Sequence, residues 1–156
     1  VMVAGRSGSA FTAEIGMMKV NEEIDAMKTI GVSPFEAVVI PRVIALIIAM
    51  PLLTFIADIA GLMGGAFAAN GLLDISVPTF MDRIQTIIKE QHFWVGIVKA
   101  PVFGILIALT ACYRGMQVSG SSESVGRKTT RSVVESIFLV FVADALFSIL
   151  FVEMGI

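Results

Sequence analysis

Residues 43–69 form a run of apolar side chains in which the only charge is Asp58. A helix needs about 20 consecutive, mostly apolar residues to cross the hydrocarbon core of a bilayer, and this run is longer than that. Residues 93–114 and 132–153 form two further charge-poor runs of sufficient length. Because backbone polar groups in lipid must find partners within their own helix, the three runs predict an all-α, polytopic integral membrane protein.

The composition excludes several classes of protein. Hydrophobic residues make up 56% of the chain and charged residues 15%, whereas soluble domains average about 45–50% and about 25%. A formal net charge of −2 provides no basic field for nucleic acid. Cys112 is the only cysteine and His92 the only histidine, so the sequence predicts neither an intramolecular disulfide nor a metal site built from these residues.

The chain begins with residues rich in Gly, Ala and Ser. Small residues three and four positions apart let membrane helices approach closely, so we expect residues 1–18 to be the cytoplasmic part of a fourth span; an irregular surface segment is the alternative. The sequence opens without Met, and we expect an N-terminal part of the natural protein to be missing. The next span is expected over residues 36–69, bent at Pro41 or Pro51, and residues 1–156 form one domain.

Residues 21–31 differ from the spans because they carry the charges of a soluble helix. Asn21 is expected to cap the N-terminus of this helix, and Gly31 is expected to follow its C-terminus. Three acidic residues lie near the positive end of the helix dipole: Glu22, Glu23 and Asp25. A short amphipathic helix between two spans offers a surface to a soluble partner.

A second helix outside the hydrocarbon core is expected in the polar connection over residues 70–92. Ser76 can cap this helix and Pro78 suits its first turn. Apolar side chains occupy one side of it: Phe80, Met81, Ile84, Ile87 and Ile88. The pattern is typical of a helix that lies on a membrane surface, although a helix packed on protein would show it too.

Basic residues near the ends of the spans predict the orientation in the membrane. Two lie on one side, Arg83 and Lys89. Seven lie on the other side: Lys19, Lys28, Arg42, Arg114, Arg127, Lys128 and Arg131. The side with seven is predicted to be cytoplasmic, together with the soluble helix, and the surface helix is predicted to lie on the far side.

The connection that follows Arg114 is basic and rich in Ser and Gly, and we expect a loop as far as Arg131. Its sequence GSSESVGRKT does not match the phosphate-binding pattern GxxxxGK[ST]. Five residues rather than four separate the two glycines, and Arg127 stands where the pattern requires Lys. No strand is predicted before it. The chain is therefore not predicted to be an ATPase. Unless the loop is only a flexible linker, it is predicted to contact a partner through Gly126, Arg127, Thr129, Thr130 and Arg131.

Charged side chains at membrane depth are costly, so they are candidate functional residues. Lys99 and Asp144 are expected at similar depths in adjacent antiparallel spans, which predicts an ion pair. Alternatively, Lys99 extends toward the membrane surface and Asp144 faces a wet cavity. Glu14 and Arg6 either line the inner part of a cavity or pair with neighbouring helices, and Asp58 has no evident partner.

Three blocks of sequence together resemble the MlaE (YrbE) family: VMVAGRSGSAFTAEIGMMKVNEEIDAMKTIGVSPFEAVVIPR at residues 1–42, IVKAPVFG at residues 97–104, and SVGRKTTRSVV at residues 124–134. The resemblance runs along essentially the whole chain, without the family's N-terminal interfacial helix and first span. Members of this family are permease subunits of ABC transporters that move phospholipids between the membranes of a double-membraned envelope.

The resemblance implies a homodimer in the bacterial inner membrane with a lipid cavity at the subunit interface. The family's intramembrane charges fall on Glu14, Lys99 and Asp144, whereas Asp58 matches no motif of the family. A cytoplasmic ABC ATPase, which carries the ATP and Mg²⁺, would bind the soluble helix as a coupling helix through Glu22, Glu23, Asp25, Ala26, Met27, Ile30 and Gly31. Further implied partners are a periplasmic ring of MCE-domain protein and a STAS-domain protein on the ATPase.

The implied function is ATP-driven movement of phospholipids between inner and outer membrane, which maintains outer-membrane lipid asymmetry. This chain would then be a permease subunit without a cofactor or an enzymatic site of its own. Two alternatives remain open. A proton-coupled secondary transporter would use Asp58 or Asp144 as its proton site, and a non-transporting membrane scaffold would need neither charge.

Overall fold

The computed structural model of the chain describes residues 1–87 and 90–153, and within residues 90–92 it describes only the backbone. The predictions that involve Ile88, Lys89 and the side chain of His92 therefore lie outside the described residues. The described chain consists of helices joined by short turns. The predicted all-α fold is confirmed.

The helices follow one another as α1 (Met2–Val20), α2 (Glu23–Thr29), the π-helix η1 (Phe35–Val39), α3 (Ile40–Leu73), α4 (Val77–Ile87), α5 (Glu90–Met116) and α6 (Ser122–Glu153). The start of the chain is thus helical rather than irregular. Three segments are long and apolar enough to cross a membrane: Phe35–Leu73, Phe93–Met116 and Ser122–Glu153. These segments make the chain a multi-pass membrane protein.

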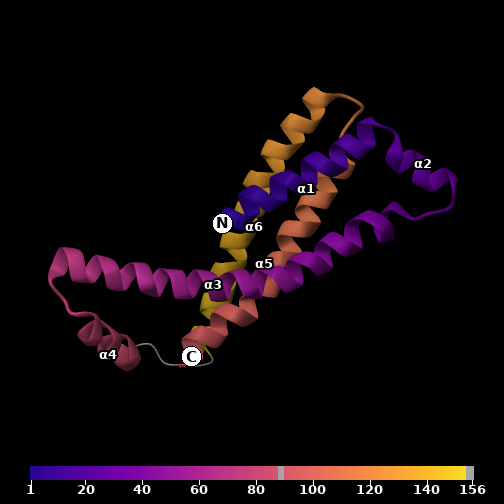
Figure 1. Ribbon diagram of the computed structural model, residues 1–156. Helices are drawn as coiled ribbons and strands as arrows, with labels where there is room; N and C mark the ends of the chain where they lie inside the picture. Colours follow the sequence, from indigo (N-terminus) through magenta and orange to yellow (C-terminus); the bar gives the residue numbers. More distant parts are fainter. Residues whose placement is uncertain (88–89, 154–156) are drawn as a thin grey trace.

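Helices α1, α5 and α6 form the centre of the molecule, and α3 packs along α5 (Figure 1). Helix α2 extends from one end of this assembly, and α4 lies near the opposite end (Figure 1). The second half of α3 projects beyond the other long helices (Figure 1) and exposes large apolar side chains: Ile59, Leu62, Met63, Phe67, Leu72 and Leu73. A continuous apolar surface of this kind suits lipid or another membrane-embedded chain.

Two clusters of buried residues hold the long helices together. The first joins all four long helices through Ala4, Leu46, Ile107, Ala108 and Val140. The second lies nearer to α2 and consists of Ile15, Ile24, Val38, Val39 and Cys112. The second cluster therefore ties α2 and η1 to α1 and α5.

Glycines allow two of the helix crossings to be close. A Cβ atom added to Gly104 of α5 would lie 2.8 Å from the carbonyl oxygen of Leu46 in α3. A Cβ atom added to Gly115 would lie 2.7 Å from Cβ of Ile15 in α1. Any larger residue at these positions would force the helices apart, in keeping with the small-residue packing of membrane helices.

A π-helix precedes α3 because of Pro41. Proline has no N–H to donate to the carbonyl of Ala37, and its ring would clash with that carbonyl in a regular α-helix. In the wider turn of η1, the N–H of Ile40 instead donates to the carbonyl of Phe35. Nη1 of Arg42 donates to the carbonyl oxygen of Val38 at 2.9 Å. The disturbance expected at Pro41 is therefore a π-turn, while Pro51 lies within the continuous helix α3.

The end of α2 matches the sequence prediction, but its start does not. Gly31 has φ 81°, its N–H donates to the carbonyl of Lys28, and the N–H of Val32 donates to the carbonyl of Met27, which is a Schellman motif. Asn21 was expected to cap α2, and that prediction is wrong. With φ −80° and ψ 5°, Asn21 closes the last turn of α1, whereas an N-cap needs extended backbone.

Helix α6 begins at Ser122, so the predicted loop as far as Arg131 is wrong. Only residues 117–121 separate α5 from α6. Oγ of Ser121 accepts the N–H of Ser124 at 3.2 Å and so starts the helix. The five residues assigned to a partner-contacting loop lie instead on the first turns of α6, where the threonine hydroxyls donate to carbonyls four residues earlier: Gly126, Arg127, Thr129, Thr130 and Arg131.

Candidate functional site

Helix α2 is attached to the rest of the molecule by two apolar side chains. Ile24 is 1% exposed, and Met27 packs beside it against the second buried cluster. The other residues predicted to couple to an ATPase are exposed: Glu22, Glu23, Asp25, Ala26, Ile30 and Gly31. A soluble protein can therefore reach most of the surface of α2.

Asp25 of α2 forms ion pairs with two lysines. Its Oδ1 lies 3.0 Å from Nζ of Lys28 and 3.7 Å from Nζ of Lys19 at the end of α1. The hydrogen bond from Lys28 is the main reason that the pKa of the Asp25 carboxyl is below its usual value, and the positive charge of Lys19 adds to this effect. Asp25 thus joins α2 electrostatically to α1, while Glu22 and Glu23 remain as exposed acidic side chains.

Lys99 of α5 and Asp144 of α6 form the ion pair that the sequence predicted. Nζ of Lys99 lies 3.2 Å from Oδ1 of Asp144 and 5.4 Å from the centre of the Phe151 ring. The Lys99 side chain is 14% exposed and that of Asp144 is 52% exposed. The pair therefore has one well-packed member and one that remains accessible at the surface of the described chain.

Glu14 of α1 pairs with Arg42 of α3, as one of the two alternatives for Glu14 predicted, and its side chain is still 61% exposed. Oε2 of Glu14 lies 2.9 Å from Nη2 of Arg42, and the Arg42 guanidinium lies 5.7 Å from the centre of the Phe11 ring. Arg6 and Asp58 are exposed, and neither has an ion-pair partner among residues 1–87 and 90–153.

One side of α1 faces away from α5 and α6. Its exposed residues recur about every fourth position: Met2, Arg6, Ala10, Glu14 and Met17. The opposite side, with Ala4, Gly8, Thr12, Ile15 and Gly16, is buried. The exposed side therefore combines small, charged and apolar residues on a helix that belongs to a membrane protein.

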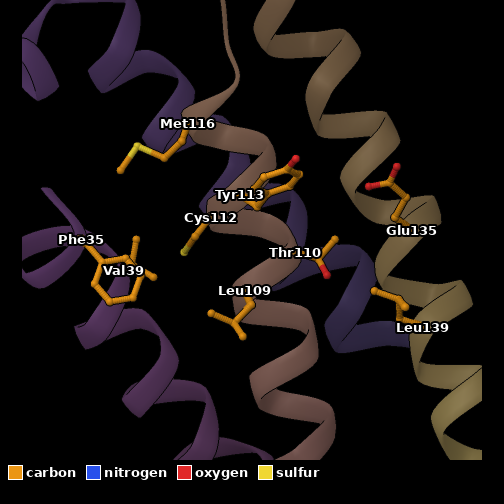
Figure 2. A pocket seen from close by; sticks show the side chains of 9 residues that line it. All are labelled: Phe35, Val39, Leu109, Thr110, Cys112, Tyr113, Met116, Glu135 and Leu139. Carbon is orange, nitrogen blue, oxygen red and sulfur yellow. The ribbon is translucent and has the colours of Figure 1, made fainter.

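An apolar groove of about 600 Å³ lies between η1, α5 and α6. Figure 2 shows its lining side chains on both flanks of α5, some toward η1 and others toward α6. The lining consists of Phe35, Val39, Leu109, Thr110, Cys112, Tyr113, Met116, Glu135 and Leu139. A smaller hollow continues from it along α6 past Val134 and Phe138.

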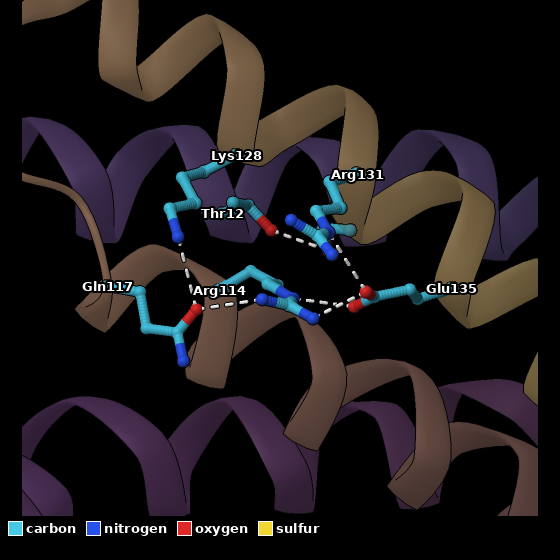
Figure 3. Close-up of polar contacts among 7 residues, drawn as sticks. Thr12, Arg114, Gln117, Lys128, Arg131 and Glu135 are labelled. Carbon is cyan, nitrogen blue, oxygen red and sulfur yellow. Dashed lines mark hydrogen bonds and ion pairs between the residues drawn. The ribbon is translucent and has the colours of Figure 1, made fainter.

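A polar network (Figure 3) adjoins this groove at the ends of α5 and α6 that lie nearest α2 (Figure 1). The carboxylate of Glu135 binds the guanidinium of Arg114 through both oxygens and lies 3.3 Å from Nε of Arg131. Oε1 of Gln117 accepts hydrogen bonds from Arg114 at 2.8 Å and from Lys128 at 3.2 Å. The network thus contains three basic side chains and one carboxylate.

Thr12 of α1 links three helices from a fully buried position. Its Oγ1 lies 2.8 Å from the carbonyl oxygen of Gly8, 3.1 Å from that of Ala111 in α5, and 2.8 Å from Oγ of Ser132 in α6. Figure 3 shows Thr12 beside the network around Glu135. These contacts fix α1 against the same parts of α5 and α6 that carry the network.

The sequence predicted the membrane side of Arg114 but no partner for Arg114, Glu135 or Thr12. Arg114 and Glu135 carry opposite charges at the facing ends of two successive spans, which is a signal that could have predicted their pairing. The assumed loop concealed it, because a long loop would have allowed the two ends to lie far apart. Within the described part of the chain, no three His, Cys, Asp or Glu side chains are grouped so that they could hold a metal ion.

Known proteins resemble this chain along most of its length. The family described as Permease MlaE matches residues 1–150. A probable ABC transporter permease protein of Rickettsia bellii is 38% identical over 151 residues, which cover 97% of this chain and 58% of that protein. A protein with the same description from Synechocystis is 35% identical over 144 residues, or 92% of this chain and 55% of that protein.

One relative is a chloroplast protein of a plant. Protein TRIGALACTOSYLDIACYLGLYCEROL 1, chloroplastic, of Arabidopsis thaliana is 34% identical over 153 residues, which cover 98% of this chain and 44% of that protein. The chain thus spans about half the length of the curated relatives it matches. The family match includes α1 to α5 and nearly all of α6. The chain belongs to the MlaE permease family.

Proposed function

We propose that the natural protein is the membrane subunit of an ABC transporter that moves phospholipids between the two membranes of a bacterial envelope. A separate ATPase subunit binds ATP and Mg²⁺ and docks on α2. The observation that carries this proposal is the exposed, acidic surface of α2, a helix whose apolar contacts with the rest of the chain are made by Ile24 and Met27. The Rickettsia and Synechocystis relatives are described as probable ABC transporter permeases, which supports an ATPase as the partner.

The packing around α2 supports a route by which its motion reaches the spans. Ile24 of α2 belongs to one buried cluster with Ile15 of α1 and Val38 of η1. The ion pair of Asp25 with Lys19 adds a second link to α1. When the ATPase displaces α2, these contacts move the end of α1 and the π-turn that leads into α3.

A lipid as cargo is supported by the surfaces that the described chain leaves open. Two copies of the permease enclose a cavity whose wall includes the exposed side of α1, with Glu14 and Arg6, and the accessible Asp144. Acyl chains contact the apolar side chains of α3, and the phosphate passes near the charged ones. The name of the Arabidopsis relative refers to a diacylglycerol lipid, which favours lipid over a water-soluble cargo.

The remaining partners and the location belong to the same proposal. The permease lies in the bacterial inner membrane, a periplasmic ring of MCE-domain protein covers the end that carries α4, and a STAS-domain protein binds the ATPase. The basic residues that cluster toward the α2 end support this orientation.

The docking is tested by a pull-down of the full-length protein in lipid nanodiscs, with bound proteins and lipids identified by mass spectrometry. One variant carries Glu22→Lys and Ile30→Asp, at the two exposed positions that directly flank α2 and whose side chains take no part in the buried cluster. A matched control carries Arg83→Glu on α4, at the opposite end of the molecule (Figure 1).

We expect the wild type and the control to retain both an ABC ATPase and phospholipid, and the α2 variant to lose the ATPase while keeping the lipid. If the wild type retains phospholipid but no ATPase, the docking role of α2 is wrong, and a proton-coupled transporter becomes the better proposal. Loss of both from the α2 variant alone would mean that the substitutions disturb the fold, which thermal unfolding of the purified variant would reveal.

A further inference from the structure

We propose that the groove between η1, α5 and α6 holds a resident phospholipid of the cytoplasmic leaflet with an anionic headgroup. This lipid is not the transported cargo, and its site is separate from a cavity shared by two copies. The inference rests on the membrane orientation in the proposed function, but it does not require that lipid be the cargo.

The shape and chemistry of the groove suit acyl chains. Its volume of about 600 Å³ lies within the roughly 300–1,000 Å³ typical of small-molecule pockets. Most of its lining is apolar, and the side chains stand on both flanks of α5, with Val39 and Met116 on one flank and Leu139 on the other (Figure 2). The two flanks of α5 can each take one of the two chains of a diacyl lipid (Figure 2).

The charge beside the groove selects the headgroup. Glu135 lines the groove, and its carboxylate is shared by the guanidinium groups of Arg114 and Arg131. With Lys128 joined through Gln117, the network has a net positive charge, and the Arg131 side chain is 65% exposed. Basic pockets between membrane helices on the cytoplasmic side bind anionic headgroups in this way.

Tyr113 marks the level of the headgroup. It lines the groove, it is 60% exposed, and the Arg114 guanidinium lies 5.4 Å from the centre of its ring. Tyrosine is enriched where the hydrocarbon core meets the headgroups. The apolar part of the groove therefore lies at the depth of acyl chains, and the basic network lies at the depth of phosphate.

The test uses the full-length permease in nanodiscs of phosphatidylethanolamine. The probe is a trace of phosphatidylglycerol with a photoactivatable diazirine on one acyl chain, and phosphatidylcholine with the same chains serves as the neutral comparison. After irradiation, mass spectrometry of peptides locates the labelled residues. Retained ATPase is measured on the same samples, so that failure of this inference and failure of the proposed function can be told apart.

Two variants address the two parts of the site, each with a matched control. Leu109→Trp fills the groove, whereas Ile149→Trp adds the same bulk at a residue of α6 that is 62% exposed and outside the groove. Arg131→Gln removes one basic side chain of the network, whereas Arg83→Gln removes one from α4.

We expect the phosphatidylglycerol probe to label residues 109–116 more strongly than the phosphatidylcholine probe does. Leu109→Trp should abolish this labelling, and Arg131→Gln should reduce the preference for phosphatidylglycerol about fivefold, the factor for one basic side chain near an anionic surface. Equal labelling by both probes along every lipid-facing helix would overturn the inference. So would the absence of label from residues 109–116 in the wild type, since a polypeptide segment or a second copy would then occupy the groove.

Discussion

Nζ of Lys99 lies 3.2 Å from Oδ1 of Asp144, and the two residues come from successive helices of the membrane-embedded part of the chain. Lys99 is the better packed of the two, with a side chain that is 14% exposed. Removing Asp144 therefore leaves a packed ammonium group without its counter-charge, whereas removing Lys99 leaves a carboxylate that, in the proposed dimer, faces the cavity between the two copies. The two single changes are not equivalent.

We predict that Asp144→Asn lowers the free energy of unfolding more than Lys99→Met does. The reason is the cost of an uncompensated charge in a poorly solvated position. A double-mutant cycle should give a coupling energy of about 1 kcal/mol, as expected for residues in direct contact. Thermal unfolding of the four proteins in detergent measures it, and Asp58→Asn, paired with Lys99→Met in the same way, should show no coupling.

Exchanging the two charges tests whether the attraction between Lys99 and Asp144 itself contributes to stability. The double variant Lys99→Asp, Asp144→Lys keeps one charge of each sign at this contact, so it should recover part of the stability that either single reversal loses. If the double variant is no more stable than the worse single reversal, the contribution of the pair depends on its surroundings, such as Phe151, rather than on the two charges.

Gly104 is predicted to set the distance between α3 and α5. A Cβ atom there would lie 2.8 Å from the carbonyl oxygen of Leu46. This oxygen belongs to the backbone of α3, so it cannot move by a change of side-chain rotamer. Gly104→Ala should therefore lower the free energy of unfolding by about 1–3 kcal/mol, the usual cost of overpacking. Gly126→Ala is the control, because a Cβ atom there meets nothing within 4 Å, and it should be neutral or stabilise α6 by about 0.5–1 kcal/mol.

The sequence predicts the helices well because each depends on local properties. The apolar run around Asp58 predicts α3 by its length alone, and Gly31 predicts the end of α2 because the left-handed backbone there favours glycine. The Lys99–Asp144 pair was also predictable, because two charges at similar depths in neighbouring spans have few other partners. Predicting these features requires only the residue types, their spacing and the thickness of the membrane.

The start of α6 and the groove depend instead on contacts between distant parts of the chain. Residues 122–131 are too polar and too rich in Ser and Thr to predict a helix, yet they are helical where Val125 packs in the neighbourhood of Gly16 in α1. The groove forms only once η1 has placed Phe35 and Val39 beside α5. Local sequence carries no information on such arrangements, since tertiary packing overrides propensity.

Two buried serines of α6 should respond differently to the same substitution. Ser132 and Ser136 are both 0% exposed, but Oγ of Ser132 lies 2.8 Å from Oγ1 of Thr12, whereas Oγ of Ser136 has no hydrogen-bond partner among the described residues. Ser132→Ala should cost about 1 kcal/mol, the net value of one hydrogen bond. Ser136→Ala should be neutral or stabilising, because it removes a buried polar group that has no partner. Thermal unfolding in detergent compares them, and equal losses would contradict the assigned bonding.

Asp25 provides a prediction on pH. Its pKa is below the usual 3.8, chiefly through the hydrogen bond from Lys28 and also through the charge of Lys19. A carboxyl whose pKa is lowered in the folded state stabilises that state above the unfolded pKa, and this contribution is lost as the pH falls through the folded pKa. The attachment of α2 to Lys19 should therefore weaken only below about pH 3.8. A titration of the Asp25 carboxyl by carbon NMR should show its pKa rising more in Lys28→Gln than in Lys19→Gln, with no change in the distant Lys128→Gln. The reverse order would mean that Lys19 of α1, rather than Lys28 of α2, is the main cause of the lowered pKa of Asp25.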